Sequence, residues 1–163
     1  MRVVSSFRCP MTTFSSVERL NEALERELLA INQYFIHSKV LKDMGLLNLS
    51  EALRSRSIGE MHHADALLER IFSCKGNPKV CYKEMGTCPR SVEKIFEKDR
   101  DLELEAISSY RKSIAQFEQN EDFVSSALMR SLLQDEEKHL EWLEQQLSLI
   151  QSLGIQQYLV KHG

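Results

Sequence analysis

The pattern Glu-x-x-His occurs twice in this chain, first at Glu60 and His63 and again at Glu136 and His139. Residues three positions apart lie on one face of an α-helix, so each copy directs a carboxylate and an imidazole toward the same point. A single copy is a weak indication, because such pairs are common on helix surfaces. Two copies in 163 residues favour a fold that brings two helices together around one polar site.

Two further glutamates precede the motifs at equal distances. The interval from Glu27 to Glu60 is the same as that from Glu103 to Glu136, so the second set repeats the first at a constant offset along the sequence. Burial of four carboxylates would be very costly unless cations compensated their charge. Carboxylate and imidazole ligands suit iron or manganese, and zinc could also occupy such a site. The repeat therefore predicts a centre for two metal ions.

Apolar residues recur at helical spacing, and glycine and proline mark the breaks between helices. The expected helices run from 15 or 16 to 42–44, from 48 to 75, from 91 to 119 and from 121 to 153, with a last turn or two over 155–160. We expect Ser15 or Ser16 to cap the first helix and Gly45 to end it in the left-handed conformation. Residues 1–14 are interpreted as a flexible tail and residues 15–163 as one domain.

The glutamate spacing agrees with these helices. The midpoint between the paired glutamates falls beside Gly45 in the first half and at Asn120 in the second, which are the expected turns. Both antiparallel hairpins therefore bring their ligands level, about 24 Å from the turn. The connection 76–90 is long enough to span a helix of about 42 Å. We predict an all-α four-helix bundle with a long crossover between the second and third helices, plus a short C-terminal helix.

Composition excludes several classes of function. The formal charge of −3 argues against a nucleic-acid-binding protein, and no apolar run approaches the ~20 residues needed to cross a bilayer. The segment 1–17 faintly resembles an organelle transit peptide, but we interpret it as a tail and place the protein in the cytoplasm. No cysteine pair has Cys-x-x-Cys spacing, so a zinc ribbon or rubredoxin site is unsupported and free thiols are expected. The four cysteines are Cys9, Cys74, Cys81 and Cys88.

Four stretches around and beyond the ligand motifs carry a resemblance to a known family. They are 27–35 (ELLAINQYF), 57–65 (SIGEMHHAD), 135–144 (DEEKHLEWLE) and 149–159 (LIQSLGIQQYL). All four resemble bacterioferritins, and the resemblance extends from about residue 18 to 160. The resemblance implies a ferritin-like bundle with a di-iron centre, an arrangement in which two helices supply Glu and two supply Glu-x-x-His. It also implies that four residues are terminal ligands and two bridge the irons. The terminal ligands would be Glu27, His63, Glu103 and His139, and the bridging ligands Glu60 and Glu136.

The resemblance further implies an iron-storage ferroxidase. Such a protein oxidises Fe(II) with O₂ or H₂O₂ and keeps the ferric mineral in a shell of 24 subunits built from two-fold dimers. A b-type haem would lie between two subunits, held by Met61 of each, with Ile31, Phe35 and Ile58 as candidate walls of its pocket. A small [2Fe–2S] ferredoxin would supply electrons for iron release. The shell would contain this chain alone or together with a second ferritin subunit.

This sequence departs from the family pattern at several positions. Ser55 and Gly59 stand where the family often has a histidine and an aspartate that bind iron on the inner surface, so iron handling there is expected to differ. Leu67 replaces a frequent aromatic residue. Arg54 and His62 replace a frequent tyrosine and lysine near the haem, which affects its expected affinity and potential.

Other interpretations stay open at this point. A rubrerythrin-like peroxidase would use the same centre without storing iron, but such proteins usually carry a rubredoxin module with paired Cys-x-x-Cys. A bundle without metal could act as a haem-bearing partner in a mixed shell. From spacing alone, Met61 would more readily be a packing residue than a haem ligand. Tyr34 and Trp142 are either core aromatics or electron donors to the centre.

Overall fold

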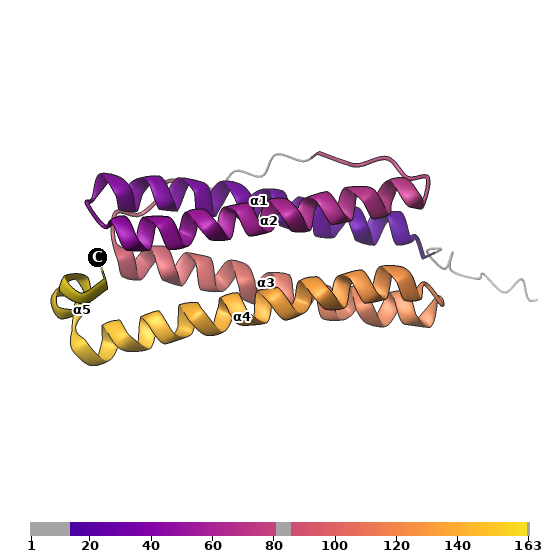
Figure 1. Ribbon diagram of the computed structural model, residues 1–163. Coiled ribbons are helices and arrows are strands. Elements are labelled where there is room, and N and C mark those ends of the chain that lie inside the picture. Colours follow the sequence, from indigo (N-terminus) through magenta and orange to yellow (C-terminus); the bar gives the residue numbers. More distant parts are fainter. Residues whose placement is uncertain (1–13, 81–85, 163) are drawn as a thin grey trace, which may run out of the picture.

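The computed structural model of the protein describes residues 14–80 and 86–162 (Figure 1). The described residues form five helices and no strand, which confirms the all-α prediction. The helices are α1 (Ser16–Asp43), α2 (Leu47–Ser73), α3 (Val92–Gln119), α4 (Phe123–Leu153) and α5 (Ile155–His162). Each begins and ends within about two residues of the expected boundary. Most of the predicted tail, and with it Cys9, lies outside the described residues, as does Cys81.

Local chemistry accounts for the helix ends. The Ser15 hydroxyl accepts a hydrogen bond from the Glu18 backbone N–H and caps α1, as predicted. Gly45 has φ +83°, the left-handed conformation in which a residue with Cβ is strained. The start of α4 differs from the expectation of 121: the Asp122 side chain accepts from the Ser125 N–H, so the helix begins after this cap and Glu121 stays in the turn with φ 59°.

The four long helices form two hairpins that pack against each other (Figure 1). The α1–α2 hairpin lies against the α3–α4 hairpin, and α5 folds across the end of the bundle where α4 finishes. α2 finishes at one end of the bundle and α3 begins at the other, so α3 runs parallel to α2 and antiparallel to α1. This is the predicted crossover bundle.

The apolar core is divided into two clusters that occupy the two ends of the bundle. One contains Leu20, Leu24, Leu67, Ile71, Tyr110, Phe117, Met129 and Leu132. The other contains Tyr34, Leu41, Leu53, Ile95, Phe96, Leu143, Ile150 and Tyr158. Between them lies a layer of buried polar side chains from α1 to α4. The two clusters supply the apolar burial that holds this polar layer in place.

Asn21 on α1 attaches the crossover to the bundle. Its side-chain N–H donates to the Asn77 carbonyl at 3.1 Å, and its oxygen accepts from the Lys79 backbone N–H at 2.6 Å. The side chain itself is buried, with an exposed fraction of 5%. One amide therefore pairs with both a donor and an acceptor of a segment that belongs to no helix.

We predict that Asn21→Ala frees this end of the crossover. Loss of a hydrogen bond of about 1 kcal/mol should speed amide hydrogen exchange at Lys79 roughly fivefold. Asn32→Ala is the matched control, because among the described residues the Asn32 side chain bonds only to the Leu28 carbonyl of its own helix. This variant should leave the exchange rate at Lys79 unchanged. Equal exchange at Lys79 in wild type and Asn21→Ala would contradict this role.

Candidate metal centre

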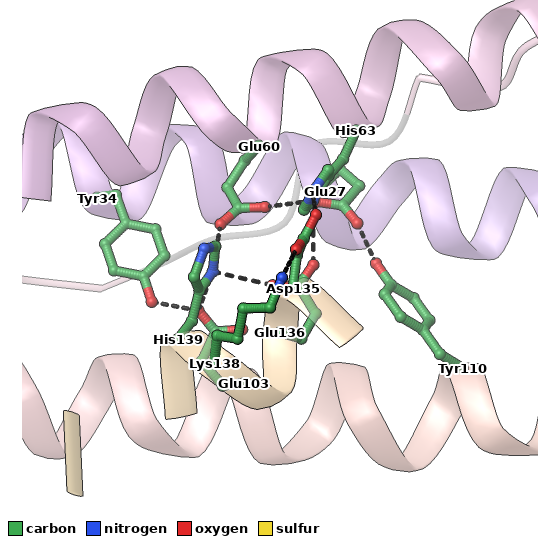
Figure 2. Close-up of polar contacts among 10 residues, drawn as sticks. All are labelled: Glu27, Tyr34, Glu60, His63, Glu103, Tyr110, Asp135, Glu136, Lys138 and His139. Atoms are coloured by element: carbon green, nitrogen blue, oxygen red, sulfur yellow. Dashed lines mark hydrogen bonds and ion pairs between the residues drawn. The ribbon is translucent and has the colours of Figure 1, made fainter. Parts of the chain in front are cut away.

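The six predicted ligands lie close together (Figure 2). They belong to the polar layer between the two apolar clusters. The carboxylates are almost fully buried, and the side chains of His63 and His139 are 13% and 10% exposed. Helices α1 and α3 each contribute one residue, and α2 and α4 each contribute two. The six are Glu27, Glu60, His63, Glu103, Glu136 and His139.

The ligand atoms form two overlapping groups that could each hold a metal ion. One consists of Glu27, Glu60, His63 and Glu136, and the other of Glu60, Glu103, Glu136 and His139. Within each group the atoms lie within 4.8 Å of one another. Two carboxylates are common to both groups, so the arrangement suits two ions that share two ligands.

Glu60 and Glu136 each face both imidazoles. The two oxygens of Glu60 lie 2.8 Å from Nδ1 of His63 and 3.1 Å from Nδ1 of His139. Those of Glu136 lie 3.2 Å and 3.1 Å from the same two nitrogens. Each carboxylate thus spans the interval between the histidines, as a bridging ligand would.

Several polar atoms of the centre lack a hydrogen-bond partner among the described residues. They are both carboxylate oxygens of Glu60, Oε2 of Glu136, and Nδ1 of His63 and of His139. These atoms lie close to one another but without hydrogen-bond geometry. Buried polar groups are nearly always satisfied in native proteins, and cations placed among these atoms would satisfy all of them at once. The donor set therefore fits metal ions.

Burial and mutual repulsion change the pKa values of the centre. Burial, together with the charges of Glu136 and Glu60, raises the pKa of Glu27 to about 8. The pKa of Glu103 and that of Glu136 are also raised, mainly by burial. Burial disfavours the His63 cation, but its contacts with Glu136, Glu27 and Glu60 outweigh this and raise its pKa. Without metal the centre therefore holds protons that metal binding would displace.

Two tyrosines orient the two carboxylates that are not shared between the ligand groups. Tyr34 donates to Oε1 of Glu103, and Tyr110 donates to Oε1 of Glu27. Both tyrosines are fully buried. They are separated along the sequence by the same offset as the two ligand sets. Tyr34 is predicted from the sequence to lie near the ligands. Tyr110 is not among the predicted residues, although the same offset identifies it.

Asp135 is a second residue that the motif spacing did not assign. Its Oδ2 lies 3.5 Å from Nε2 of His63, the ring nitrogen that points away from the candidate metal positions. Its Oδ1 accepts from Nζ of Lys138 at 2.7 Å, and this bond lowers the pKa of Asp135. Carboxylates in this relation to a metal-binding imidazole commonly fix its orientation.

The predicted haem ligand lies away from this centre. The Met61 side chain is 47% exposed, and Phe35 and Ile58 are 42% and 44% exposed. These residues come from α1 and α2, whereas Ile31, also expected in the pocket wall, packs against the core. The structure therefore presents an exposed thioether and apolar side chains on the α1–α2 hairpin.

The remaining predicted residues have varied surroundings. Trp142 is half-buried. Its ring packs edge-to-face with that of Phe96, and the guanidinium of Arg56 lies 5.7 Å from its centre. Leu67 is a core residue. Cys74 and Cys88 are half-buried free thiols. The following departures from the family pattern lie outside the core: Arg54, Ser55, Gly59 and His62.

Among the described helices, none combines the length and apolar character required to cross a bilayer.

A four-helix bundle with a long crossover and a centre of carboxylates and imidazoles drawn from all four helices defines the ferritin-like class. The ferritin-like domain family matches residues 17–153. The chain is 40% identical over 146 residues to bacterioferritin of Streptomyces coelicolor, covering 88% of this chain and 86% of the relative. It is 39% identical over 142 residues to bacterioferritin of Brucella melitensis, with 87% and 88% covered. A bacterial ferritin of Pseudomonas aeruginosa is 41% identical over 146 residues, with 88% and 93% covered. The chain belongs to the bacterioferritin family, which confirms the resemblance seen in the sequence.

We predict that the metal-free protein loses stability as pH rises between about 5 and 8. Over this range the folded state keeps a proton on Glu27, whose pKa is about 8 instead of the usual 4.5, while the unfolded chain has lost it. The free energy of unfolding therefore falls with rising pH. His63 adds to the fall above its usual pKa of 6.5, because its pKa is also raised in the fold.

Thermal melts of chelator-treated protein across this pH range will measure how steeply the melting temperature falls with pH. Glu27→Gln should make it shallower, and Glu22→Gln on the exposed side of the same helix should not. A melting temperature that rises with pH in the wild type would contradict the assignment of protons to the centre.

Proposed function

We propose that this protein is an iron-storage ferroxidase. The observation that carries the proposal is that Glu60 and Glu136 each face both imidazoles. In a centre with four carboxylates, this arrangement suits two like ions held at a fixed separation. The proposed substrate is Fe(II), two ions for each chain, with O₂ or H₂O₂ as the electron acceptor. The ferric product would be stored as mineral.

The protein's part in the reaction is to bind and orient. Glu27 and His63 would hold one Fe(II), Glu103 and His139 the other, and Glu60 and Glu136 both. Tyr34 and Tyr110 fix the carboxylates of Glu103 and Glu27 through their hydrogen bonds. The apolar clusters on either side keep bulk water out and the geometry constant. Oxidation then depends on two electrons leaving two neighbouring ions together.

The haem assignment rests on Met61. An exposed thioether with apolar neighbours on the same hairpin would suit a ligand for haem at an interface between two copies of the chain. Each copy would supply one Met61, with Phe35 and Ile58 against the haem. When bound, the haem would provide a route for electrons from a [2Fe–2S] ferredoxin to the stored mineral for its reductive release.

Assembly follows from the same proposal. We infer a shell of 24 subunits built from two-fold dimers, composed of this chain alone or with a second ferritin subunit, in the cytoplasm. Residues 15–163 would form its single ferritin-like domain. Storage distinguishes this function from that of a rubrerythrin-like peroxidase, which would oxidise without retaining mineral.

The proposal is tested by aerobic addition of excess Fe(II) to metal-free protein, with oxidation followed by absorbance and the product analysed by gel filtration and an iron count. The wild type should elute at hundreds of kilodaltons with many irons per chain. Glu136→Ala should slow the initial oxidation by about a hundredfold or more, because both ions lose a shared ligand. Glu137→Ala is the matched control, since this neighbour is exposed and pairs with Arg111.

Retention of only about two irons per chain would contradict iron storage and indicate a di-iron enzyme instead. Unchanged oxidation in Glu136→Ala would reject the centre as the place of oxidation.

We predict that Met61→Leu abolishes haem binding without affecting Fe(II) oxidation. Leucine keeps the apolar surface but removes the sulfur that would bind the haem iron. Reconstitution with haem, followed by its absorption spectrum, will measure the loss. Met44→Leu, at the end of α1, should bind haem as the wild type does, and a normal haem spectrum in Met61→Leu would refute the assignment.

A further inference from the structure

The ligand repeat allows the two halves of the centre to be compared residue by residue. Tyr34 and Glu103 in one half correspond to Tyr110 and Glu27 in the other, and both pairs are hydrogen-bonded (Figure 2). The correspondence ends one helical turn farther from the centre. Four residues before Glu103 on α3 stands Asp99, whereas four residues before Glu27 on α1 stands Ala23.

Asp99 is the centre of a buried polar cluster. Its Oδ1 lies 2.7 Å from Nδ1 of His37 and accepts a hydrogen bond of 2.8 Å from the Gln33 side chain. Asp99 and His37 are 0% and 3% exposed. The residues that correspond to His37 and Gln33 in the other half are Ser113 and Ser109. Only one half of the molecule therefore carries an ionisable pair in this position.

These contacts involve only one of the two carboxylate oxygens of Asp99. Oδ2 is buried and has no hydrogen-bond partner among the described residues. The other unpartnered carboxylate oxygens, on Glu60 and Glu136, belong to the candidate metal centre. Asp99 is not one of its ligands, so this oxygen needs a different role, such as accepting from a bound water molecule.

The Asp99 cluster lies next to Tyr34. Asp99 and Glu103 share one face of α3, about 6 Å apart along the axis, and Tyr34 and His37 share one face of α1. The pKa of Tyr34 is raised by burial, by the charge of Glu103 and then by that of Asp99. Where two buried polar groups make no direct hydrogen bond, a water molecule can bridge them, and the unpartnered Oδ2 of Asp99 is available to such a water.

The cluster also reaches the surface. Gln33 is half-buried, and its side-chain N–H also donates to the Lys98 carbonyl at the outside of the bundle. The Lys98 cation acts on Asp99 from α3, and the Cys88 thiol, which is sensitive to the charge of Asp99, lies on the segment before α3. Burial raises the pKa of Asp99, while His37 and Gln33 partly oppose the rise.

Iron oxidation requires an outlet for protons. Two Fe(II), one H₂O₂ and two waters give two FeOOH and four protons, with atoms and charge in balance. With O₂ as oxidant, two Fe(II) and four waters give two FeOOH, one H₂O₂ and the same four protons. A buried centre between two apolar clusters must pass these protons to solvent, since accumulated positive charge in a medium of low dielectric is costly.

We propose that Asp99, held in position by His37, is a proton relay that serves only the Glu103–Tyr34 half of the centre, an inference that rests on the proposed ferroxidase function. An O–H bond of the water between Tyr34 and Asp99 breaks, and a new O–H bond forms at Oδ2 of Asp99. The water regains a proton from the centre, and Asp99 then releases its proton to solvent beside Gln33. No electron moves in this step. His37 donates from Nδ1 to Oδ1 and holds the carboxyl group in position.

The test compares Asp99→Asn with Ser113→Ala, which alters the corresponding place in the other half. Protein loaded anaerobically with two Fe(II) per chain is mixed with H₂O₂, and oxidation and proton release are followed by absorbance and a pH indicator in H₂O and D₂O. Asp99→Asn should release protons about tenfold more slowly, with a larger solvent isotope effect. Ser113→Ala should match the wild type. His37→Gln provides a second variant if Asp99→Asn does not fold.

Equilibrium titration with Co(II), which is not oxidised under these conditions, separates the relay from metal binding. Wild type and Asp99→Asn should bind the same number of ions with the same visible spectrum. Loss of Co(II) binding in Asp99→Asn, or wild-type proton release and isotope effect in that variant, would overturn the relay. Equal slowing by Ser113→Ala would overturn its restriction to one half. Failure of the wild type to bind Co(II) would instead reject the proposed function.

Discussion

The free-energy cost of removing four carboxylates from water is the main constraint on this structure. Glu27, Glu60, Glu103 and Glu136 lie side by side in the middle of a helical bundle, where each ionised group would repel the others. Such a layer persists only if protons, histidine cations or metal ions compensate the charge. The apolar clusters at both ends supply the burial that keeps the layer together. Metal ions at the centre would relieve this repulsion, so the same buried carboxylates suit cations.

The sequence predicted most of this centre because its ligands obey two regular rules. Helical periodicity placed Glu60 with His63 and Glu136 with His139, and the constant offset between the two ligand sets linked the halves. Tyr110 follows the second rule and could have been found with it. Asp99 and His37 follow neither, because they have no counterpart in the repeat and their contact depends on how α1 and α3 face each other. The start of α4 was misplaced because the Asp122 side chain, rather than a glycine or proline, decides it.

Helix α2 carries two different candidate sites on two of its faces. Glu60 and Met61 are consecutive residues, yet Glu60 is buried in the centre and Met61 is exposed on the outer side of the hairpin. A turn of about 100° per residue accounts for the difference. A rotation of this helix about its axis would move both side chains together. The position of Glu60 in the interior and that of Met61 on the exposed surface therefore constrain each other.

The near-equivalence of the two hairpins bears on how such a chain can evolve. Each hairpin carries half of the ligands and one orienting tyrosine, so two copies of a single hairpin, paired about a two-fold axis, would form a complete symmetric centre. In such a dimer every substitution appears twice. Once the crossover joins the halves into one polypeptide, each half can mutate alone. A difference such as that between Asp99 and Ala23 is possible only in a joined chain, and the crossover thus lets the two halves of the candidate centre have different surroundings.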